Sequence, residues 1–160
     1  MASLAFRPGT VEDVPLILEF IRHLAEYERL AHEVSATEEG LRKTLFGERK
    51  VAEVVFALLD GKEVAFALFF HNYSTFLAKP GLYLEDLFVL PEYRGQGVGK
   101  AMLRHLAGVA LERGCGRFEW WVLDWNEPSI EFYRRQGAVA MDEWTVFRVT
   151  GEALERLAST

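Results

Sequence analysis

Hydrophobic residues in the first third of the chain recur every three or four positions, which is the spacing of a helix with one buried face. These positions are Val14, Ile17, Ile21, Leu24 and Ala25. A short strand over 4–7 precedes them, and Thr10-Val11-Glu12-Asp13 has the capping-box spacing that starts a helix. We expect this helix to run to about Arg29. The same spacing in Ser35-Ala36-Thr37-Glu38 predicts a second helix, which ends by Gly47.

The middle of the chain changes to the apolar runs of buried strands. Val51–Leu59 and Glu63–Phe70 flank Asp60-Gly61, a dipeptide that favours a tight hairpin turn. Tyr73–Gly81 is predicted to be a loop and Leu82–Leu90 the next strand. These runs predict antiparallel pairing in the first part of a sheet.

The last part of the chain alternates between helices and strands. The expected elements are a helix over 101–111 stopped by Gly114, a strand at Phe118–Leu123, a helix at Ser129–Gln136, a β region within Val139–Val149 and a helical turn or two over 152–157. A helix that connects two strands of one sheet makes those strands parallel. The order therefore predicts an α/β fold with a mixed, mostly antiparallel central sheet and helices on both faces.

A turn spaced by glycines lies between the Leu82–Leu90 run and the helix that follows it. Gly95, Gly97 and Gly99 permit positive φ and a close approach of the backbone to a ligand. The unpaired N–H groups and the dipole of the helix start favour an anion such as phosphate. Two cationic side chains, Arg94 and Lys100, flank the turn. We call residues 94–100 the glycine turn and predict that it binds a phosphate group.

Two familiar phosphate loops do not fit the glycine turn. A dinucleotide-binding loop would need glycine at Lys100, and a nucleoside-triphosphate loop would need glycine at Arg94. The pattern Arg94-x-x-Gly97-x-Gly99 instead resembles the pyrophosphate-binding signature of the GCN5-related N-acetyltransferases (GNAT family). Trp125–Gly137, in which an asparagine opens a short helix, resembles that family's second conserved region.

Further blocks resemble one branch of that family. Leu24-Ala25-Glu26-Tyr27-Glu28 and Tyr83-Leu84-Glu85-Asp86 are similar to the diamine acetyltransferases, the spermidine/spermine and thialysine N-acetyltransferase group. The resemblance implies a single GNAT domain over residues 1–160. It also implies a reaction in which the acetyl group of acetyl-CoA passes directly to the primary amine of a diamine, polyamine or lysine-like amino acid.

The resemblance assigns the acetyl-CoA contacts residue by residue. Backbone groups of the strand before the turn would hold the pantetheine arm and polarise the acetyl carbonyl: Leu87, Phe88 and Val89. The pyrophosphate would lie on the glycine turn: Arg94, Gly95, Gln96, Gly97, Val98, Gly99 and Lys100. Asn126 and Ser129 would line the pantetheine end of the cofactor.

The resemblance also assigns the two catalytic residues. Tyr133 would donate a proton to the departing CoA thiolate, as a phenol with an ordinary pKa of about 10 can do in a partly dry site. Glu85 would accept a proton from the substrate ammonium, whose ordinary pKa is about 10.4. The alternatives are an aromatic packing role for Tyr133 and an exposed or salt-bridged position for Glu85. In a regular strand Asp86 would point to the face of the sheet opposite to that of Glu85, unless a β-bulge breaks the alternation.

Five residues are predicted to bind the amine because carboxylates and aromatic faces attract cations. They are Tyr27, Glu28, Glu85, Glu119 and Trp120. The alternative for Glu26 and Glu28 is a solvated helix end. The diamine group is commonly homodimeric, with substrate sites near the subunit contact, so the resemblance also implies a homodimer.

Composition limits the remaining possibilities. A net charge of -6 without a basic stripe argues against a nucleic-acid partner. No apolar run is long enough for a membrane span, and the start of the chain lacks the pattern of a signal peptide, so we expect a cytoplasmic protein. The single cysteine, Cys115, cannot form an intrachain disulfide. The four histidines show no metal-ligand spacing, so no metal is predicted.

Two other functions compete with small-amine acetylation. One is acetylation of a protein N-terminus or lysine side chain, which would need an open groove. The other is a non-catalytic sensor that binds acyl-CoA. A sensor could keep the glycine turn and lose the acid and base, whereas Tyr133 and Glu85 are both present.

Overall fold

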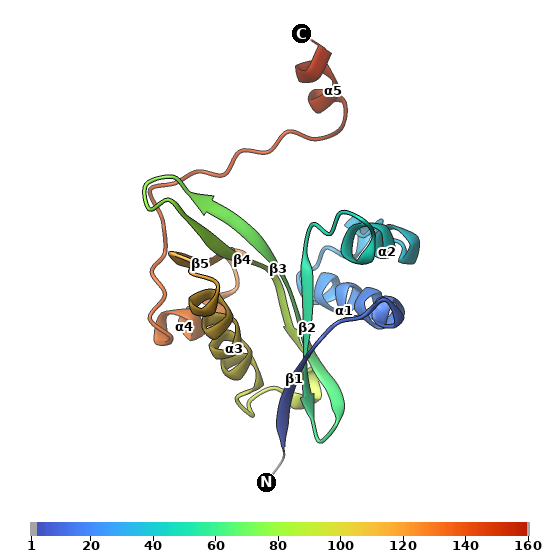
Figure 1. Ribbon diagram of the computed structural model, residues 1–160, viewed down its shortest axis with the longest axis vertical. Helices are drawn as coiled ribbons and strands as arrows, with labels where there is room; N and C mark the ends of the chain where they lie inside the picture. The colour runs from blue at the N-terminus through green and yellow to red at the C-terminus, as the bar shows by residue number, and fades with distance from the viewer. Residues whose placement is uncertain (1–2, 160) are drawn as a thin grey trace. The chain divides into compact units, whose positions relative to one another are not determined.

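A computed structural model describes residues 3–159 of the chain (Figure 1). Met1, Ala2 and Thr160, which the predicted domain over 1–160 includes, lie outside the described residues. The chain forms two compact units, Met1–Trp125 and Asn126–Thr160. The first unit holds the sheet, and the second holds two helices joined by an extended segment.

The sheet of the first unit has five strands in the order of the chain. They are β1 Leu4–Pro8, β2 Glu53–Leu59, β3 Lys62–Ser74, β4 Lys79–Val89 and β5 Arg117–Trp120. The pairs β1–β2, β2–β3 and β3–β4 are antiparallel, whereas β4 and β5 are parallel. The predicted mixed, mostly antiparallel sheet is confirmed, including its parallel step.

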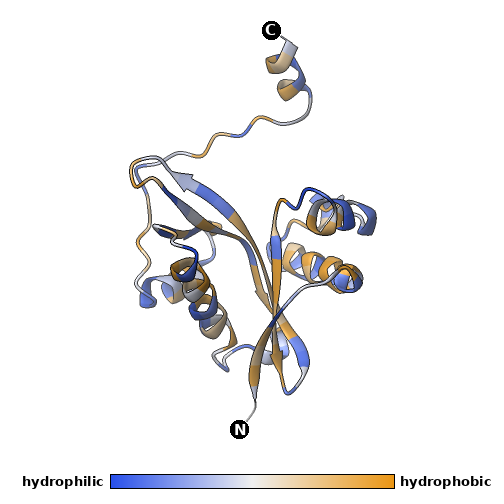
Figure 2. Cartoon of the chain, in the orientation of Figure 1, coloured by the Kyte–Doolittle hydropathy of each residue, from blue (hydrophilic) through white to orange (hydrophobic). Residues whose placement is uncertain are grey.

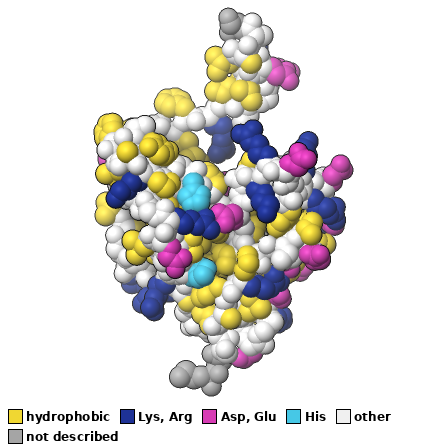
Figure 3. Space-filling view, in the orientation of Figure 1, with side chains coloured by type: hydrophobic (Ala, Val, Ile, Leu, Met, Phe, Trp, Pro, Cys, Tyr) yellow, Lys and Arg dark blue, Asp and Glu magenta, His cyan; other side chains and the backbone are white. Residues whose placement is uncertain are grey.

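Helices cover both faces of this sheet, as predicted. Helices α1 (Val14–Tyr27) and α2 (Glu38–Phe46) lie on one face and α3 (Val98–Glu112) on the other (Figure 1). Three 3₁₀ turns join these elements: η1 Val11–Asp13, η2 Ala31–Glu33 and η3 Pro91–Tyr93. Hydrophobic residues run along the strands and the helices that pack on them (Figure 2), and charged side chains cover much of the outside of α1 and α2 (Figure 3).

An aromatic cluster fills the core between the sheet and the first two helices. Its buried members are Ile17, Phe20, Leu45, Val54, Phe56, Phe66 and Phe88. The rings of Phe20 and Phe66 stack with their centres 5.1 Å apart. Burying a side chain of this kind stabilises a fold by about 1.5 to 3 kcal/mol, so this cluster fixes β4 against α1.

Both predicted helix starts are found, one of them displaced. The Asp13 carboxylate accepts a hydrogen bond from the Thr10 N–H at 2.7 Å and pairs with the Arg7 guanidinium at 2.8 Å, and the Arg7 bonds lower the pKa of Asp13 to about 2. Helix α2 is capped by Thr37, whose hydroxyl oxygen accepts from the Gly40 N–H at 3.0 Å. The predicted start near Ser35 is therefore two residues early: the extended cap residue and the acidic first turn come after it.

The predicted loop over Tyr73–Gly81 is wrong for most of its length. Pairing of β3 with β4 continues to Ser74 and Lys79, which leaves only 75–78 as the turn. The left-handed position of this turn is taken by Ala78, with φ 53°. Because this residue is not a glycine, the sequence does not indicate where the turn lies. Gly81 instead lies in β4, where a side chain would collide with the Asn72 side chain.

The second unit begins with α4 (Glu127–Arg135) and ends with α5 (Gly151–Ser159), so both predicted helices are confirmed. The β region predicted within Val139–Val149 is wrong, because none of these described residues belongs to a strand. The alternating apolar residues are there, but a strand also needs a partner for its backbone groups, which a sequence pattern does not supply. Several of these side chains are exposed: Val139, Met141, Trp144, Val146, Phe147 and Val149.

None of the helices between residues 3 and 159 has the length and apolar character that crossing a membrane requires.

Candidate active site

Strand β4 has an open edge beside the glycine turn. Its pairing with β5 covers only Gly81–Leu84, so from Glu85 to Val89 the described sheet offers β4 a partner on the β3 side alone. The Leu90 N–H donates to the Val64 oxygen of β3, which turns the carbonyl of Val89 away from β3. The predicted pantetheine-binding residues Leu87, Phe88 and Val89 therefore belong to a strand segment whose outer side has no strand partner in the described sheet, although the outward carbonyl of Val89 accepts a hydrogen bond from Arg94.

The glycine turn leads from β4 through η3 into α3. Gly95 and Gly97 have φ of 76° and 81°, and Gly97 is the residue that precedes the first turn of α3. A side chain added at either glycine would meet no atom within 4 Å. These positions need glycine for their backbone conformation, and the space beside them is open.

Other members of the turn differ from the expectation. Gly99 lies within α3 without a positive φ, so only two of the three glycines need their conformational freedom. Val98 is buried and anchors the helix, Lys100 is exposed, and the Gln96 side-chain amide contacts the Glu92 carbonyl at 3.5 Å. The open N–H groups of a helix start, next to an exposed lysine, suit a phosphate group.

Arg94 does not extend over the turn that it flanks. Its Nε donates to the Val89 carbonyl at 2.9 Å, and its guanidinium lies 5.0 Å from the ring centres of both Tyr27 and Phe88. The arginine of the signature thus connects the open edge of β4 with the end of α1.

A β-bulge in β4 brings two adjacent carboxylates to this edge. Leu68 of β3 lies opposite Asp86 and the next residue, Phe69, lies opposite Leu84, so Glu85 has no partner in the register. Leu68 packs on the core that includes α1, which places Asp86 on the α1 face of the sheet. Because of the bulge, Asp86 lies on the same face of the sheet as α1, whose last turn carries Tyr27.

Glu28, at the end of α1, joins these two residues in one carboxylate cluster, which we define as Glu28, Glu85 and Asp86. Burial, together with the charges of Glu85 and Glu28, raises the pKa of Asp86 to about 7. Burial and the Glu85 charge likewise raise the pKa of Glu28. A carboxylate cluster in which the ionisation of Glu28 and Asp86 is disfavoured forms a site that a cation would stabilise.

Aromatic rings border the carboxylate cluster. The half-exposed Tyr27 ring lies 6.4 Å from that of Phe88 and 6.3 Å from that of Trp125. The guanidinium of Arg29 lies 4.4 Å from the centre of the Trp125 ring. Ring faces and carboxylates together form an environment for a cationic substrate.

The other two predicted substrate residues lie on β5 and make different contacts. Glu119 pairs with Arg117 at 2.8 Å and accepts a hydrogen bond from the Asn72 side-chain amide at 3.1 Å. The Trp120 ring packs on Phe118 with ring centres 5.0 Å apart, although its backbone lies opposite Leu84, next to the bulge. Tyr27, Glu28 and Glu85 are therefore brought together, whereas Glu119 belongs to an ion pair.

The second unit carries the predicted acid and two cofactor residues. The Asn126 side-chain oxygen accepts from the Ser129 N–H at 3.4 Å and so caps α4, with Pro128 in its first turn. Tyr133 lies in the last turns of α4, with its ring centre 5.5 Å from that of Phe132. The asparagine of the second motif thus has a structural role in starting this helix.

Two features of the site were missed by sequence reasoning. Asp86 lies on the α1 face because a β-bulge breaks the strand alternation, and the residue types of β4 do not indicate where this bulge lies. Trp125 enters the sequence analysis only as the first residue of the second motif, and its approach to the Tyr27 ring depends on the fold. Among the described residues, no group of three or more His, Cys, Asp or Glu side chains could hold a metal ion.

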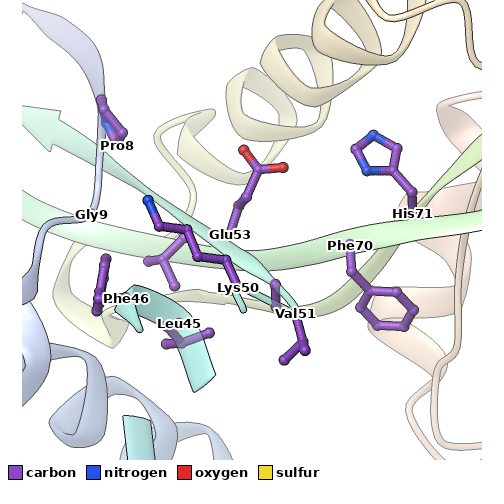
Figure 4. A pocket seen from close by; sticks show the side chains of 11 residues that line it. Pro8, Gly9, Leu45, Phe46, Lys50, Val51, Glu53, Phe70 and His71 are labelled. Carbon is purple, nitrogen blue, oxygen red and sulfur yellow. The ribbon is translucent and has the colours of Figure 1, made fainter. Parts of the chain in front are cut away.

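A separate cavity of about 410 Å³ lies where β1 ends (Figure 4). Apolar residues such as Leu45 and Phe70 line it, together with the polar side chains of Lys50, Glu53 and His71. Glu53 is held by Arg113 of α3 at 2.6 Å, so its charge is already neutralised. None of the lining residues belongs to the carboxylate cluster or the glycine turn.

Comparisons with known proteins identify the family to which the chain belongs. The profile of the acetyltransferase (GNAT) family matches residues 18–138. A thialysine N-epsilon-acetyltransferase of Mus musculus is 40% identical over 169 residues, covering 99% of each chain. An L-ornithine N5-acetyltransferase of Arabidopsis thaliana is 35% identical, covering 94% of this chain and 86% of that relative. An integron cassette protein from the mobile metagenome of V. cholerae is similar in structure, with a TM-score of 0.82, 26% identity and 99% of each chain covered. With a family profile over most of its length and relatives of this similarity, the chain belongs to the GNAT family and is an N-acetyltransferase.

Proposed function

We propose that this enzyme transfers the acetyl group of acetyl-CoA to a primary amine of a small basic molecule, by direct attack in a ternary complex. The observation that carries the proposal is the carboxylate cluster, which lies with the Tyr27 ring beside the open edge of β4. A molecule with two positive charges fits such a site better than a neutral amine does. Relatives named for acetylating thialysine and L-ornithine, both of which carry a distal amine, support the same substrate class.

Acetyl-CoA would bind along the open edge and the glycine turn. The backbone of Leu87–Val89 would pair with the pantetheine arm and donate to the acetyl carbonyl oxygen. A donor directed at a developing oxyanion contributes about 3 to 4 kcal/mol to transition-state stabilisation. The pyrophosphate would lie at the start of α3, where Gly95 and Gly97 leave open space. Asn126 and Ser129 would contact the cofactor from α4.

The proton transfers are assigned to a carboxylate and a phenol. Glu85, with Asp86 beside it, would accept the first proton from the substrate ammonium, directly or through a water. The free amine then attacks the acetyl carbon, the new C–N bond forms and the C–S bond breaks. Tyr133 donates a proton to the CoA thiolate. The amine nitrogen loses its second proton as the amide forms, and this proton replaces the one that Tyr133 has given up. The products are the amide, CoA thiol and one proton released to solvent.

We further propose that the enzyme is a cytoplasmic homodimer in which residues 1–160 act as one GNAT domain. The exposed apolar side chains of 139–149 support the dimer, since a second copy could cover them. The lone Cys115 is compatible with a reducing compartment.

Release of free CoA thiol from acetyl-CoA tests the function. The panel should hold thialysine, lysine, ornithine, putrescine, spermidine, spermine, an aminoglycoside and short peptides, with controls lacking amine or enzyme. We expect the highest kcat/KM with a small molecule that carries two amines. Activity confined to peptides would replace the proposal with protein acetylation, and acetyl-CoA binding without release on any amine would contradict it.

A further inference from the structure

The amine site has a positively charged side as well as a negatively charged one. The carboxylate cluster includes Glu85 and Asp86 of β4, whereas the Trp125 ring near Tyr27 has the guanidinium of Arg29 over its face. The Tyr27 and Trp125 ring centres are 6.3 Å apart, and the Arg29 guanidinium is 4.4 Å from the Trp125 ring. A cation and a set of carboxylates therefore lie within the reach of one small molecule.

Arg29 is held in this position by its backbone. It follows Glu28, the residue that ends α1, and takes a left-handed φ of 62°. Its N–H donates to the Glu26 carbonyl at 3.1 Å, and the next N–H, of Leu30, donates to the Ala25 carbonyl at 2.8 Å. These bonds close the helix end and direct the Arg29 side chain along the Trp125 face.

The charge of Arg29 is available to a ligand. No salt bridge to Arg29 occurs among residues 3–159, whereas Arg7, Arg42, Arg113 and Arg117 are each paired with a carboxylate. Arg94, the other guanidinium near Tyr27, already donates to the Val89 carbonyl. An exposed guanidinium stacked on a ring keeps its in-plane donors free for a bidentate bond to a carboxylate.

We infer that Arg29 binds the α-carboxylate of the substrate and so selects basic α-amino acids over diamines of the same length. This inference rests on the proposed function and names its substrate class. The α-ammonium group would lie between Trp125 and Glu28, and the distal amine would point along the Tyr27 ring toward Glu85 and the open edge of β4. A diamine fills only the negatively charged side of this site and leaves Arg29 without a partner.

Two substrate pairs isolate the carboxylate. Ornithine and putrescine, like lysine and cadaverine, differ only by that group. In the wild type we expect a higher kcat/KM for the amino acid of each pair, and Arg29→Gln should lower it by about 10- to 100-fold, the effect of losing a hydrogen bond between charged groups. Putrescine and cadaverine lack the carboxylate, so Arg29→Gln should not lower their kcat/KM. Arg29→Lys should restore part of the preference, and ornithine methyl ester should behave like putrescine.

The matched control is Arg22→Gln, which removes the same charge from an exposed position of α1. It should leave both substrates of each pair unaffected. Equal kcat/KM for ornithine and putrescine in the wild type, or an equal loss of both in Arg29→Gln, would overturn the inference while leaving the proposed function in place.

Calorimetric titration of ornithine and putrescine into the CoA-bound enzyme gives a readout that does not depend on turnover. Tighter binding of ornithine in the wild type, lost in Arg29→Gln, supports the inference even if no amine in the panel is acetylated. Ornithine that binds no more tightly than putrescine overturns it.

Discussion

The guanidinium of Arg94 lies 5.0 Å from the centre of the Tyr27 ring, so a cation already occupies one face of the aromatic group that we assign to the amine. A ring face attracts a cation by about 0.5 to 2 kcal/mol. The same ring thus contacts the arginine of the phosphate-binding signature and the space beside the carboxylate cluster.

Replacing Tyr27 should therefore weaken amine binding more than it slows the reaction. Tyr27→Leu is expected to raise KM for the preferred amine by about 2- to 30-fold, the range of a lost cation–π contact. Tyr27→Phe keeps the ring face and should stay near the wild type. Steady-state kinetics at saturating acetyl-CoA measure both, with Tyr73→Leu at the exposed hairpin as the control. A large KM effect in Tyr27→Phe would show that the hydroxyl, rather than the ring, is needed.

The buried carboxyl group of Asp86 should lower the stability of the fold at high pH. Its folded-state pKa of about 7 lies above the ordinary value of 3.8, because burial and the neighbouring carboxylates disfavour its charge. The unfolded chain loses this proton at a lower pH than the folded chain, so stability falls as pH rises from about 4 to 7 and stays lower above that.

Asp86→Asn removes this charge and should stabilise the protein by about 1 to 3 kcal/mol at pH 8, while the gain disappears toward pH 4. Urea unfolding at the two pH values measures the difference. We expect the variant to bind the amine more weakly. The matched control Glu48→Gln changes an exposed carboxylate outside the cluster and should have neither effect. A variant less stable than the wild type at pH 8 would contradict the assigned cause of the raised pKa.

Gly97 and Gly108 separate the effect of backbone conformation from that of added volume. A methyl group at either position would meet no atom within 4 Å, but Gly97 has a φ of 81°, whereas Gly108 lies inside α3. Gly97→Ala should lose about 1 to 2 kcal/mol through left-handed strain and bind acetyl-CoA at least tenfold more weakly. Gly108→Ala should gain up to about 1 kcal/mol and bind acetyl-CoA normally. Calorimetric titration with acetyl-CoA measures the two affinities. Equal affinities in the two variants would show that the glycine turn does not bind the cofactor.

Tyr133→Phe tests the assigned acid. Loss of proton donation to the thiolate should lower kcat by about 10²- to 10⁴-fold, with acetyl-CoA affinity unchanged. Rapid-mixing experiments are needed to establish that chemistry limits the rate, and Tyr93→Phe in η3 serves as the control. Wild-type turnover in the variant, with chemistry rate-limiting, would assign Tyr133 a packing role.

The extended segment of the second unit should control assembly. Trp144 is 73% exposed and Phe147 is 91% exposed. Exposure of such large apolar side chains to water is unfavourable, and contact with a partner subunit would remove it. Trp144→Asp combined with Phe147→Asp should convert a dimer to a monomer, as measured by light scattering after size exclusion. Leu111→Asp, at an exposed position of α3, should leave the mass unchanged. A monomeric wild type would refute the proposed dimer.

Helix positions and the order of the strands were predictable because they follow from local periodicity and capping. Leu24 and the apolar residues before it determine which face of α1 is buried, and the Asp60-Gly61 turn, with φ of 50° and 81°, fits its dipeptide. The glycine turn was predictable because glycines at alternate positions, directly before a helix, have few structural roles other than a turn of this kind.

Errors arose where structure depends on distant partners. Ser74 and Lys79 continue a hairpin through residues that look like a loop, since cross-strand pairing outweighs composition. Residues 139–149 have the pattern of a strand but no pairing within the described chain. The bulge at Glu85 places Asp86 in the carboxylate cluster through the pairing of β4 with β3, which neither Glu85 nor Asp86 indicates by its residue type.

The open edge of β4 carries a further consequence for the protein before its substrates bind. An exposed strand edge is a template for unwanted association with other chains. Here the bulge at Glu85 interrupts the regular spacing of donors and acceptors that an incoming strand would need, and Arg94 occupies the outward carbonyl of Val89. These two features leave room for a narrow, flexible ligand while protecting the free enzyme from aggregation at the site where it must stay open.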